Sequence, residues 1–99
     1  MAEVIWTAPA LDDLNDVAEY IALSNLLTAK SLVQNVFDKV SRLEAHPDSG
    51  KKPVELQKLN YREIVVNPCR VFYKVDNNQV YILHVMRQER ALRKFLLNS

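Results

Sequence analysis

The stretch from Tyr61 to Arg87 constrains the fold more than any other part of the chain. It contains three runs rich in β-branched and aromatic residues, YREIVV, RVFYKV and VYILHVMR. Such residues suit the pleated, half-buried surface of a sheet. The runs are separated by Asn67-Pro68 and by Asp76-Asn77-Asn78, which are turn sequences. The stretch therefore predicts an antiparallel meander with one face on a helical layer and functional residues on the other face or at one end.

A short strand over residues 3–7 and a first helix are predicted ahead of this meander. Thr7 can cap that helix. Pro9 suits its first turn, because the N–H that proline lacks would have no partner within the helix there. Apolar residues at helical spacing mark its buried stripe: Leu11, Leu14, Val17, Ala18 and Ile21. The helix is expected to end near residues 24–25.

A second, longer helix is predicted from about Leu27 to Ala45, and it has the strongest apolar periodicity in the chain. The short connection between the two helices predicts an antiparallel hairpin. The predicted core of the protein takes residues from both helices and the meander: Leu14, Ile21, Leu32, Val36, Phe37, Val40 and Val71.

The remaining segments complete the predicted order of elements. His46 to Gly50 contains the only glycine of the chain and ends the second helix, and Val54–Lys58 is expected to add a short strand. Residues 88–97 predict a short amphipathic helix, which must dock on something to be stable. The fold class is α+β, a helical hairpin on one face of a mostly antiparallel sheet, within a single domain over residues 1–99.

Charge is distributed unevenly along the chain, although the total is only +1. Residues 1–50 hold three Lys and Arg against eight Asp and Glu, whereas residues 51–99 hold ten against four. The basic half suits an acidic partner, protein or nucleic acid, and the alternative is that the charges only solvate two surfaces.

Several classes of protein are disfavoured by composition. The single Cys allows no intramolecular disulfide, and no apolar run approaches the roughly 18 residues of a membrane helix. His46 and His84 are isolated, and one glycine cannot make a phosphate-binding loop. We therefore expect a cytoplasmic protein with no metal, no cofactor and no membrane contact.

Three groups of residues together resemble a known family. The first group lies in the opening strand and helix: Trp6, Thr7, Ala10, Asp13, Leu14, Tyr20 and Ile21. The second surrounds the glycine turn: Leu43, Pro47, Gly50, Lys51 and Lys52. The third lies in the meander: Arg62, Glu63, Arg70, Tyr73, Ile82 and Val85. In this order they resemble the ParE/RelE toxin superfamily over nearly the whole chain.

This resemblance implies a fold, a partner and two alternative targets. The last strand of the family closes the sheet beside the first strand, and a cognate antitoxin wraps around the toxin. ParE-like members poison DNA gyrase without cutting nucleic acid, and RelE-like members are ribosome-dependent mRNA endonucleases. His84, Arg87 and Cys69 depart from the usual pattern of the family, so a catalytic set cannot be transferred directly.

RNA cleavage would need a base, cations for the phosphate and an acid. Glu63 could be the base, and His84 or Tyr73 the acid. The cations would be Arg62, Arg70 and Arg87. The alternative is structural: Glu63 pairs with an Arg on a neighbouring strand, while Tyr73 and His84 fill sheet positions.

The near-neutral charge and the absence of a basic stripe on the long helix favour the ParE side, since docking on ribosomal RNA needs strong positive charge. We therefore expect a gyrase-poisoning toxin with a ParD-like antitoxin, no catalysis of its own and no sequence-specific contact with nucleic acid. The expected gyrase contacts are Arg87, Arg90, Arg93, Lys94 and Phe95. The expected antitoxin contacts are Arg62, Arg70, Tyr73, Leu92, Phe95 and Leu96. A non-toxic peptide-binding module remains a further alternative.

Overall fold

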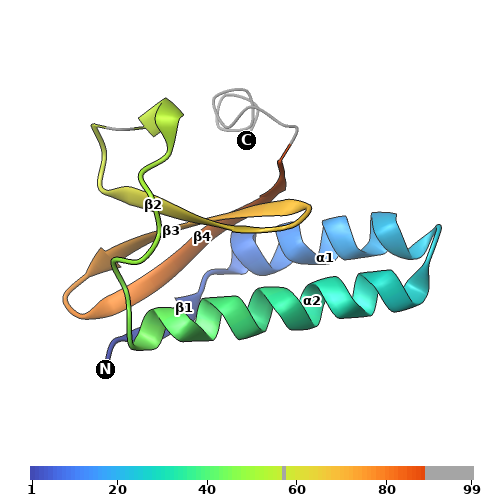
Figure 1. Ribbon diagram of the computed structural model, residues 1–99, viewed down its shortest axis with the longest axis horizontal. Helices are drawn as coiled ribbons and strands as arrows, with labels where there is room; N and C mark the ends of the chain where they lie inside the picture. Colours follow the sequence, from blue (N-terminus) through green and yellow to red (C-terminus); the bar gives the residue numbers. More distant parts are fainter. Residues whose placement is uncertain (57, 89–99) are drawn as a thin grey trace.

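The computed structural model describes residues 1–56 and 58–88. Two helices pack against one face of a four-stranded sheet (Figure 1). The elements follow one another as β1 (Glu3–Trp6), α1 (Ala8–Ala22), α2 (Leu26–Ser41), β2 (Tyr61–Val66), β3 (Cys69–Asp76) and β4 (Gln79–Arg87). Two short 3₁₀ turns lie between α2 and β2, η1 at Arg42–Glu44 and η2 at Val54–Leu56.

The sheet is mixed, with strand order β1-β4-β3-β2. The predicted meander is confirmed, because β2, β3 and β4 pair antiparallel in sequence. Asn77 and Asn78 have φ of 50° and 61° in the β3–β4 turn, a conformation that Asn tolerates well. β1 joins the sheet parallel to β4, which agrees with the closure that the family resemblance implies.

Both helices begin at side-chain caps. Thr7 Oγ1 accepts the Ala10 N–H at 3.4 Å and donates to the Ile82 carbonyl at 2.6 Å, so one residue caps α1 and ties it to β4. Asn25 Oδ1 accepts the Thr28 N–H at 3.0 Å and caps α2. The predicted hairpin and its Thr7 cap are therefore confirmed.

The core lies between the hairpin and the sheet. It takes Ala10 and Leu14 from α1 and four residues, spaced three or four apart, from α2. Those four are Ala29, Leu32, Val36 and Val40. They face inner residues of the strands, including Val71 and Ile82, which have no exposed surface. Of the predicted core, all but Phe37 lie in this cluster or pack against it.

Four sequence predictions are wrong. Phe37 is 39% exposed and Leu11 is 44% exposed, because each lies beside the buried row of its helix and not on it. The strand predicted at Val54–Lys58 is instead the turn η2, with Val54 80% exposed. In addition, α2 ends at Ser41 and continues to Glu44 only as η1. The helix predicted over residues 88–97 lies outside the described residues beyond Gln88.

Phe37 provides a test of the corrected core. Its ring packs on Trp6 of β1, with centroids 4.9 Å apart, so Phe37→Ala should cost only about 1 kcal/mol of unfolding free energy. Val36→Ala removes a fully buried side chain and should cost about 2 kcal/mol. Urea unfolding of both variants measures the ordering, and a larger loss for Phe37 would restore it to the core.

Candidate functional site

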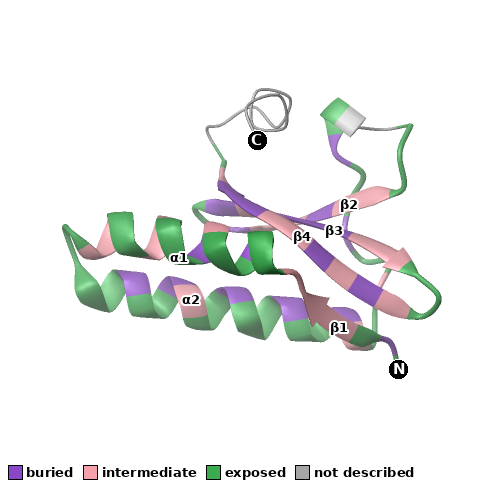
Figure 2. Ribbon diagram, turned by 180° about the vertical axis from the view of Figure 1, so that it is seen from behind, coloured by how far each residue is buried: buried purple, intermediate pink, exposed green. Residues whose placement is uncertain are grey.

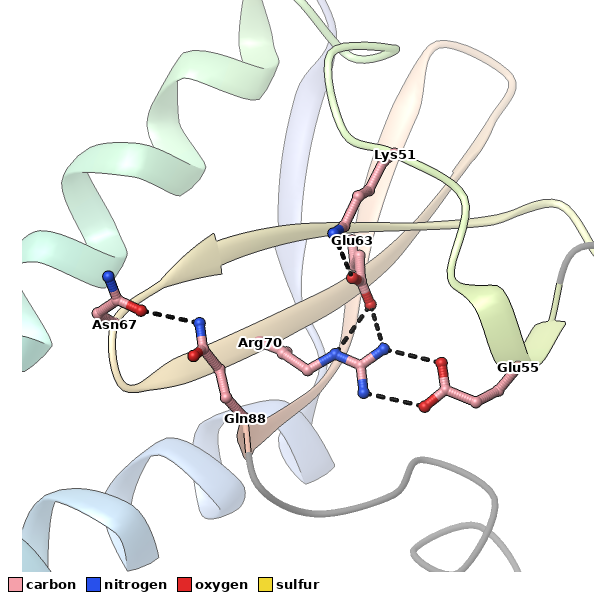
Figure 3. Close-up of polar contacts among 6 residues, drawn as sticks. All are labelled: Lys51, Glu55, Glu63, Asn67, Arg70 and Gln88. Atoms are coloured by element: carbon pink, nitrogen blue, oxygen red, sulfur yellow. Dashed lines mark hydrogen bonds and ion pairs between the residues drawn. The ribbon is translucent and has the colours of Figure 1, made fainter.

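Arg70 is the centre of an ion-pair network on the sheet (Figure 3). Its guanidinium donates to Glu63 Oε2 from Nε at 3.0 Å and from Nη2 at 2.6 Å. It also holds Glu55 through two parallel bonds, Nη1 to Oε2 at 3.0 Å and Nη2 to Oε1 at 2.9 Å. Lys51 Nζ lies 3.6 Å from Glu63 Oε1. Two cations therefore balance two carboxylates.

The strands place this network on the sheet face away from the helices. Ile64 and Val71 belong to the core side, so Glu63 and Arg70, which alternate with them, point the other way. Val65 is the register partner of Arg70, which makes Glu63 and Arg70 diagonal neighbours. Backbone bonds between Lys51 and Glu63, at 3.0 and 2.7 Å, fix the segment before η2 against the β2 edge.

Apart from Lys51, whose side chain is 70% exposed, the network is largely withdrawn from solvent. The side chains of Glu63 and Arg70 are only 4% and 13% exposed, and Glu55 is 26% exposed. The hydrogen bonds that Arg70 donates to Glu55 and to Glu63 raise the pKa of Arg70 above its usual value and outweigh burial, which acts in the opposite direction. Arg70 also stacks on Phe72, with Cζ 4.8 Å from the ring centroid. The guanidinium of Arg70 is therefore bound by Glu55 and Glu63 and stacked on Phe72.

Tyr73 and Arg62 both bind the loop that follows η1. The Tyr73 hydroxyl donates to the Pro47 carbonyl and accepts the Gly50 N–H, both at 2.8 Å. Arg62 Nη1 donates to the carbonyls of Asp48 at 3.2 Å and Gly50 at 2.8 Å. Burial raises the pKa of Tyr73, which keeps the phenol neutral and suited to its donor role.

His84 and Arg87 lie against α1. Asp13 Oδ2 accepts the Val85 N–H at 3.1 Å and lies 3.1 Å from His84 Nδ1. β1 pairs with β4 only as far as Ile82, so Asp13 satisfies a backbone donor just beyond the end of that pairing. The Arg87 guanidinium lies over the Tyr20 ring, 4.8 Å from its centroid. These contacts fix the end of β4 to the helical layer.

The structure thus divides the residues proposed for RNA cleavage among three places. Glu63 and Arg70 lie together in the network. The side chain of Arg62 binds the loop at residues 48–50. His84 and Arg87 contact α1. Tyr73 has no exposed surface and offers none to an antitoxin. The other predicted contacts lie outside the described residues: Arg90, Leu92, Arg93, Lys94, Phe95 and Leu96.

Sequence reasoning missed two contacts that organise this arrangement. Glu55 belongs to the segment predicted as a strand, and its contact with Arg70 joins positions 15 apart across an irregular loop. The sequence identifies Asp13 only as part of the family resemblance, whereas in the structure it reaches Val85, 72 positions away. Neither contact follows a periodic pattern, so the sequence offered no means of finding them.

Asp13 gives a pH-dependent prediction. Burial raises the pKa of Asp13 above its usual 3.8, and the bonds to Val85 and His84 offset this only in part. The folded carboxyl therefore binds its proton more readily than the unfolded one, and its contribution to stability is lost as pH rises through the raised pKa. Unfolding free energies of the wild type minus those of Asp13→Asn should fall over that window. A difference that grows with pH would contradict this sign.

Within residues 1–56 and 58–88, the structure contains no cluster of His, Cys, Asp and Glu that could hold a metal ion. In the same ranges no helix is long and apolar enough to cross a membrane.

Comparisons with known proteins give one family match and a curated relative that covers nearly the whole chain. Residues 4–92 match the family described as ParE toxin of type II toxin-antitoxin system, parDE. Toxin RelE2 of Caulobacter vibrioides is 30% identical over 95 residues, which cover 94% of this chain and 99% of that protein. 

Two solved structures share the fold. The chromosomal ParDE TA system from P. aeruginosa matches with a TM-score of 0.75 at 24% identity, over 90% of this chain and 98% of that one. The toxin-antitoxin complex RelBE2 from Mycobacterium tuberculosis matches with a TM-score of 0.58 at 22% identity, over 88% and 98%.

Proposed function

The chain belongs to the ParE toxin family of type II toxin–antitoxin systems, and on this premise we propose that it inhibits growth by binding DNA gyrase. The inhibition is a protein–protein contact, and the toxin contributes no chemistry of its own. A cognate ParD-like antitoxin neutralises it. Inhibition of gyrase would stop replication, and the toxin would not cleave RNA.

The Arg70 network is the observation that carries the proposal. A general base must reach a substrate proton, and a phosphate-binding cation must keep donors for the phosphate. Glu63 is 4% exposed and ion-paired with Arg70, and Arg70 also holds Glu55 in a bidentate pair. The residues best suited to RNA cleavage therefore satisfy one another, which supports a structural role for them.

The basic end of the chain is the proposed gyrase contact. Arg87 lies at the end of β4, and the residues after it combine cations with an apolar anchor. Those residues are Arg90, Arg93, Lys94 and Phe95. Arg and aromatic side chains carry much of the energy at protein interfaces.

The antitoxin contact is proposed on the basic half of the chain. Residues 51–99 hold ten Lys and Arg against four Asp and Glu, so an acidic amphipathic segment is the matching partner. It would contact Arg62 together with the apolar side chains Leu92, Phe95 and Leu96, whereas Arg70 is already occupied by Glu55 and Glu63. Part of this attraction is electrostatic, so its affinity should weaken with salt.

Two observations favour the alternative, a ribosome-dependent endonuclease of RelE type. The relative from Caulobacter vibrioides is named Toxin RelE2, and Glu63 and Arg70 share one face of the sheet here. Cleavage would require a substrate phosphate to displace Glu55 from Arg70. A non-toxic peptide-binding module would inhibit neither target.

Two assays with the purified full chain separate these functions. With gyrase, relaxed plasmid and ATP, the protein should suppress supercoiling or trap cleaved DNA, and on translating ribosomes it should leave mRNA intact. Replacing Arg90, Arg93 and Lys94 by Ala should abolish the gyrase effect, whereas the matched change Lys51, Lys52 and Lys58 to Ala should preserve it. Cleavage of mRNA with gyrase unaffected would establish the RelE alternative.

A further inference from the structure

Two large apolar side chains are buried on the sheet face that the helices do not cover. Phe72 and Met86 are each 2% exposed, yet neither belongs to the core cluster between the hairpin and the sheet. Phe72 lies two residues after Arg70 on β3, and Met86 is the register partner of Arg70 on β4, so all three share one face. In both views α1 and α2 lie on the other side of the sheet (Figures 1 and 2). We call Phe72 and Met86 the outer patch.

The contacts described on this face cover the outer patch only in part. The Arg70 guanidinium stacks on Phe72, with Cζ 4.8 Å from the ring centroid, and shields one side of the ring. The η2 turn reaches the face through Glu55, which binds Arg70, but Val54 of the same turn is 80% exposed. Burial of two large apolar side chains needs an apolar partner surface, and neither the two helices nor Val54 supplies it.

The C-terminal tail, residues 89–99, begins beside the outer patch. β4 ends at Arg87, directly after Met86, and the Gln88 N–H donates to the Pro68 carbonyl at 2.9 Å. The chain is therefore held at the β2–β3 turn where the tail begins. A helix over residues 89–99 would extend about 16 Å, which spans three strands at a spacing of about 4.8 Å. The tail is thus long enough to cross the sheet over the patch.

The sequence of the tail is amphipathic. Leu92 and Leu96 are spaced i, i+4 and share one side of a helix, with Phe95 at its margin. A helix this short is unstable unless its apolar side is docked. The outer patch has the apolar character that this side requires. The opposite side of the helix carries the cations of the proposed gyrase contact, Arg90, Arg93 and Lys94.

We propose that the tail packs Leu92 and Leu96 on the outer patch and holds its cations outward for the target. The docking depends only on the patch and the tail, whereas its role in inhibition rests on the gyrase contact proposed above. Phe72 and Met86 are then positioning residues, because they touch no target but fix the element that does. A tail fixed in this way loses less conformational entropy when it binds. The antitoxin can reach Leu92 and Leu96 only in molecules whose tail has left the sheet.

Methyl NMR of the full chain, purified away from its antitoxin, tests the docking. Met1 and Met86 are the only methionines, so the Met86 methyl is readily assigned. We expect nuclear Overhauser contacts between this methyl and the methyls of Leu92 and Leu96. Limited trypsin digestion gives a second readout, since a docked tail should be cut slowly at its cations.

A variant of the tail itself releases the contact without altering the folded domain. In Leu92→Ser with Leu96→Ser, the contacts to the Met86 methyl should disappear. Trypsin should cut this tail about tenfold faster, and gyrase inhibition should fall by about tenfold, because the tail is no longer held in place. The matched control is Leu23→Ser with Leu27→Ser, which changes two leucines of the hairpin that are 85% and 74% exposed. It should alter none of the three measurements.

Each readout can overturn the inference separately. A Met86 methyl with no contact to either leucine contradicts the docking, and so does a wild-type tail that trypsin cuts as fast as that of the double variant. A tail that docks in a protein without effect on gyrase supports the docking and contradicts the proposed function alone.

Discussion

Arg70→Ala should lower the free energy of unfolding by about 3–5 kcal/mol, because it leaves the carboxylate of Glu63 buried without its main partner. Lys51 cannot replace Arg70, since its amine is 3.6 Å away and its side chain is 70% exposed. Urea unfolding measures the loss.

Matched variants separate the network from general damage. Glu55→Ala removes a partner that is 26% exposed and leaves the Glu63–Arg70 pair intact, so it should cost only about 1 kcal/mol. Arg70→Met combined with Glu63→Leu replaces the buried pair with apolar side chains and should recover most of the stability. If Arg70→Ala costs less than about 1 kcal/mol, the pair is not structural.

Gly50→Ala should cost about 2–3 kcal/mol through overpacking. A Cβ at this position would lie 2.5 Å from the Tyr73 hydroxyl oxygen and 2.7 Å from the Glu63 carbonyl oxygen. Tyr73 is fully buried and the Glu63 carbonyl is bonded to Lys51, so neither atom can move freely. Thermal unfolding of the variant measures this cost.

Tyr73→Phe is the control for this site. It removes the acceptor of the buried Gly50 N–H without adding atoms, so it should cost about 1–2 kcal/mol. Gly50→Ala at wild-type stability would show that the loop at residues 47–50 yields easily and does not hold Tyr73 in place.

Elements with a period were predictable from the sequence. The alternation in the meander and the i, i+3, i+4 pattern in α2 each identify an element and its buried face, since both follow from local geometry. Phe37 shows the limit, because periodicity cannot tell the centre of a buried stripe from its flank. Val54–Lys58 shows another limit, as five residues with mixed character carry too little pattern to separate a strand from a 3₁₀ turn.

The candidate site was predictable only as a set of residue types. The sequence suggested that Glu63 either acts as a base or pairs with an Arg of a neighbouring strand, and the observed pair with Arg70 agrees with the second reading. The hydrogen bond that Arg70 donates to Glu55 and the contact between Asp13 and His84 depend on where loops and helices pack, which local sequence does not determine. The charge difference between the two halves of the chain likewise does not predict which charged side chains contact one another.

The activity of Glu63→Gln against gyrase tests the central claim most directly. Glutamine keeps the size of the side chain and a hydrogen-bond acceptor for Arg70, while it removes the carboxylate that a general base would need. With the folded variant, a supercoiling assay should give inhibition equal to that of the wild type within about twofold, since the contact requires no proton transfer. Loss of gyrase inhibition in a variant that folds like the wild type would contradict the account, and loss of mRNA cleavage on translating ribosomes would make Glu63 the base of a nuclease.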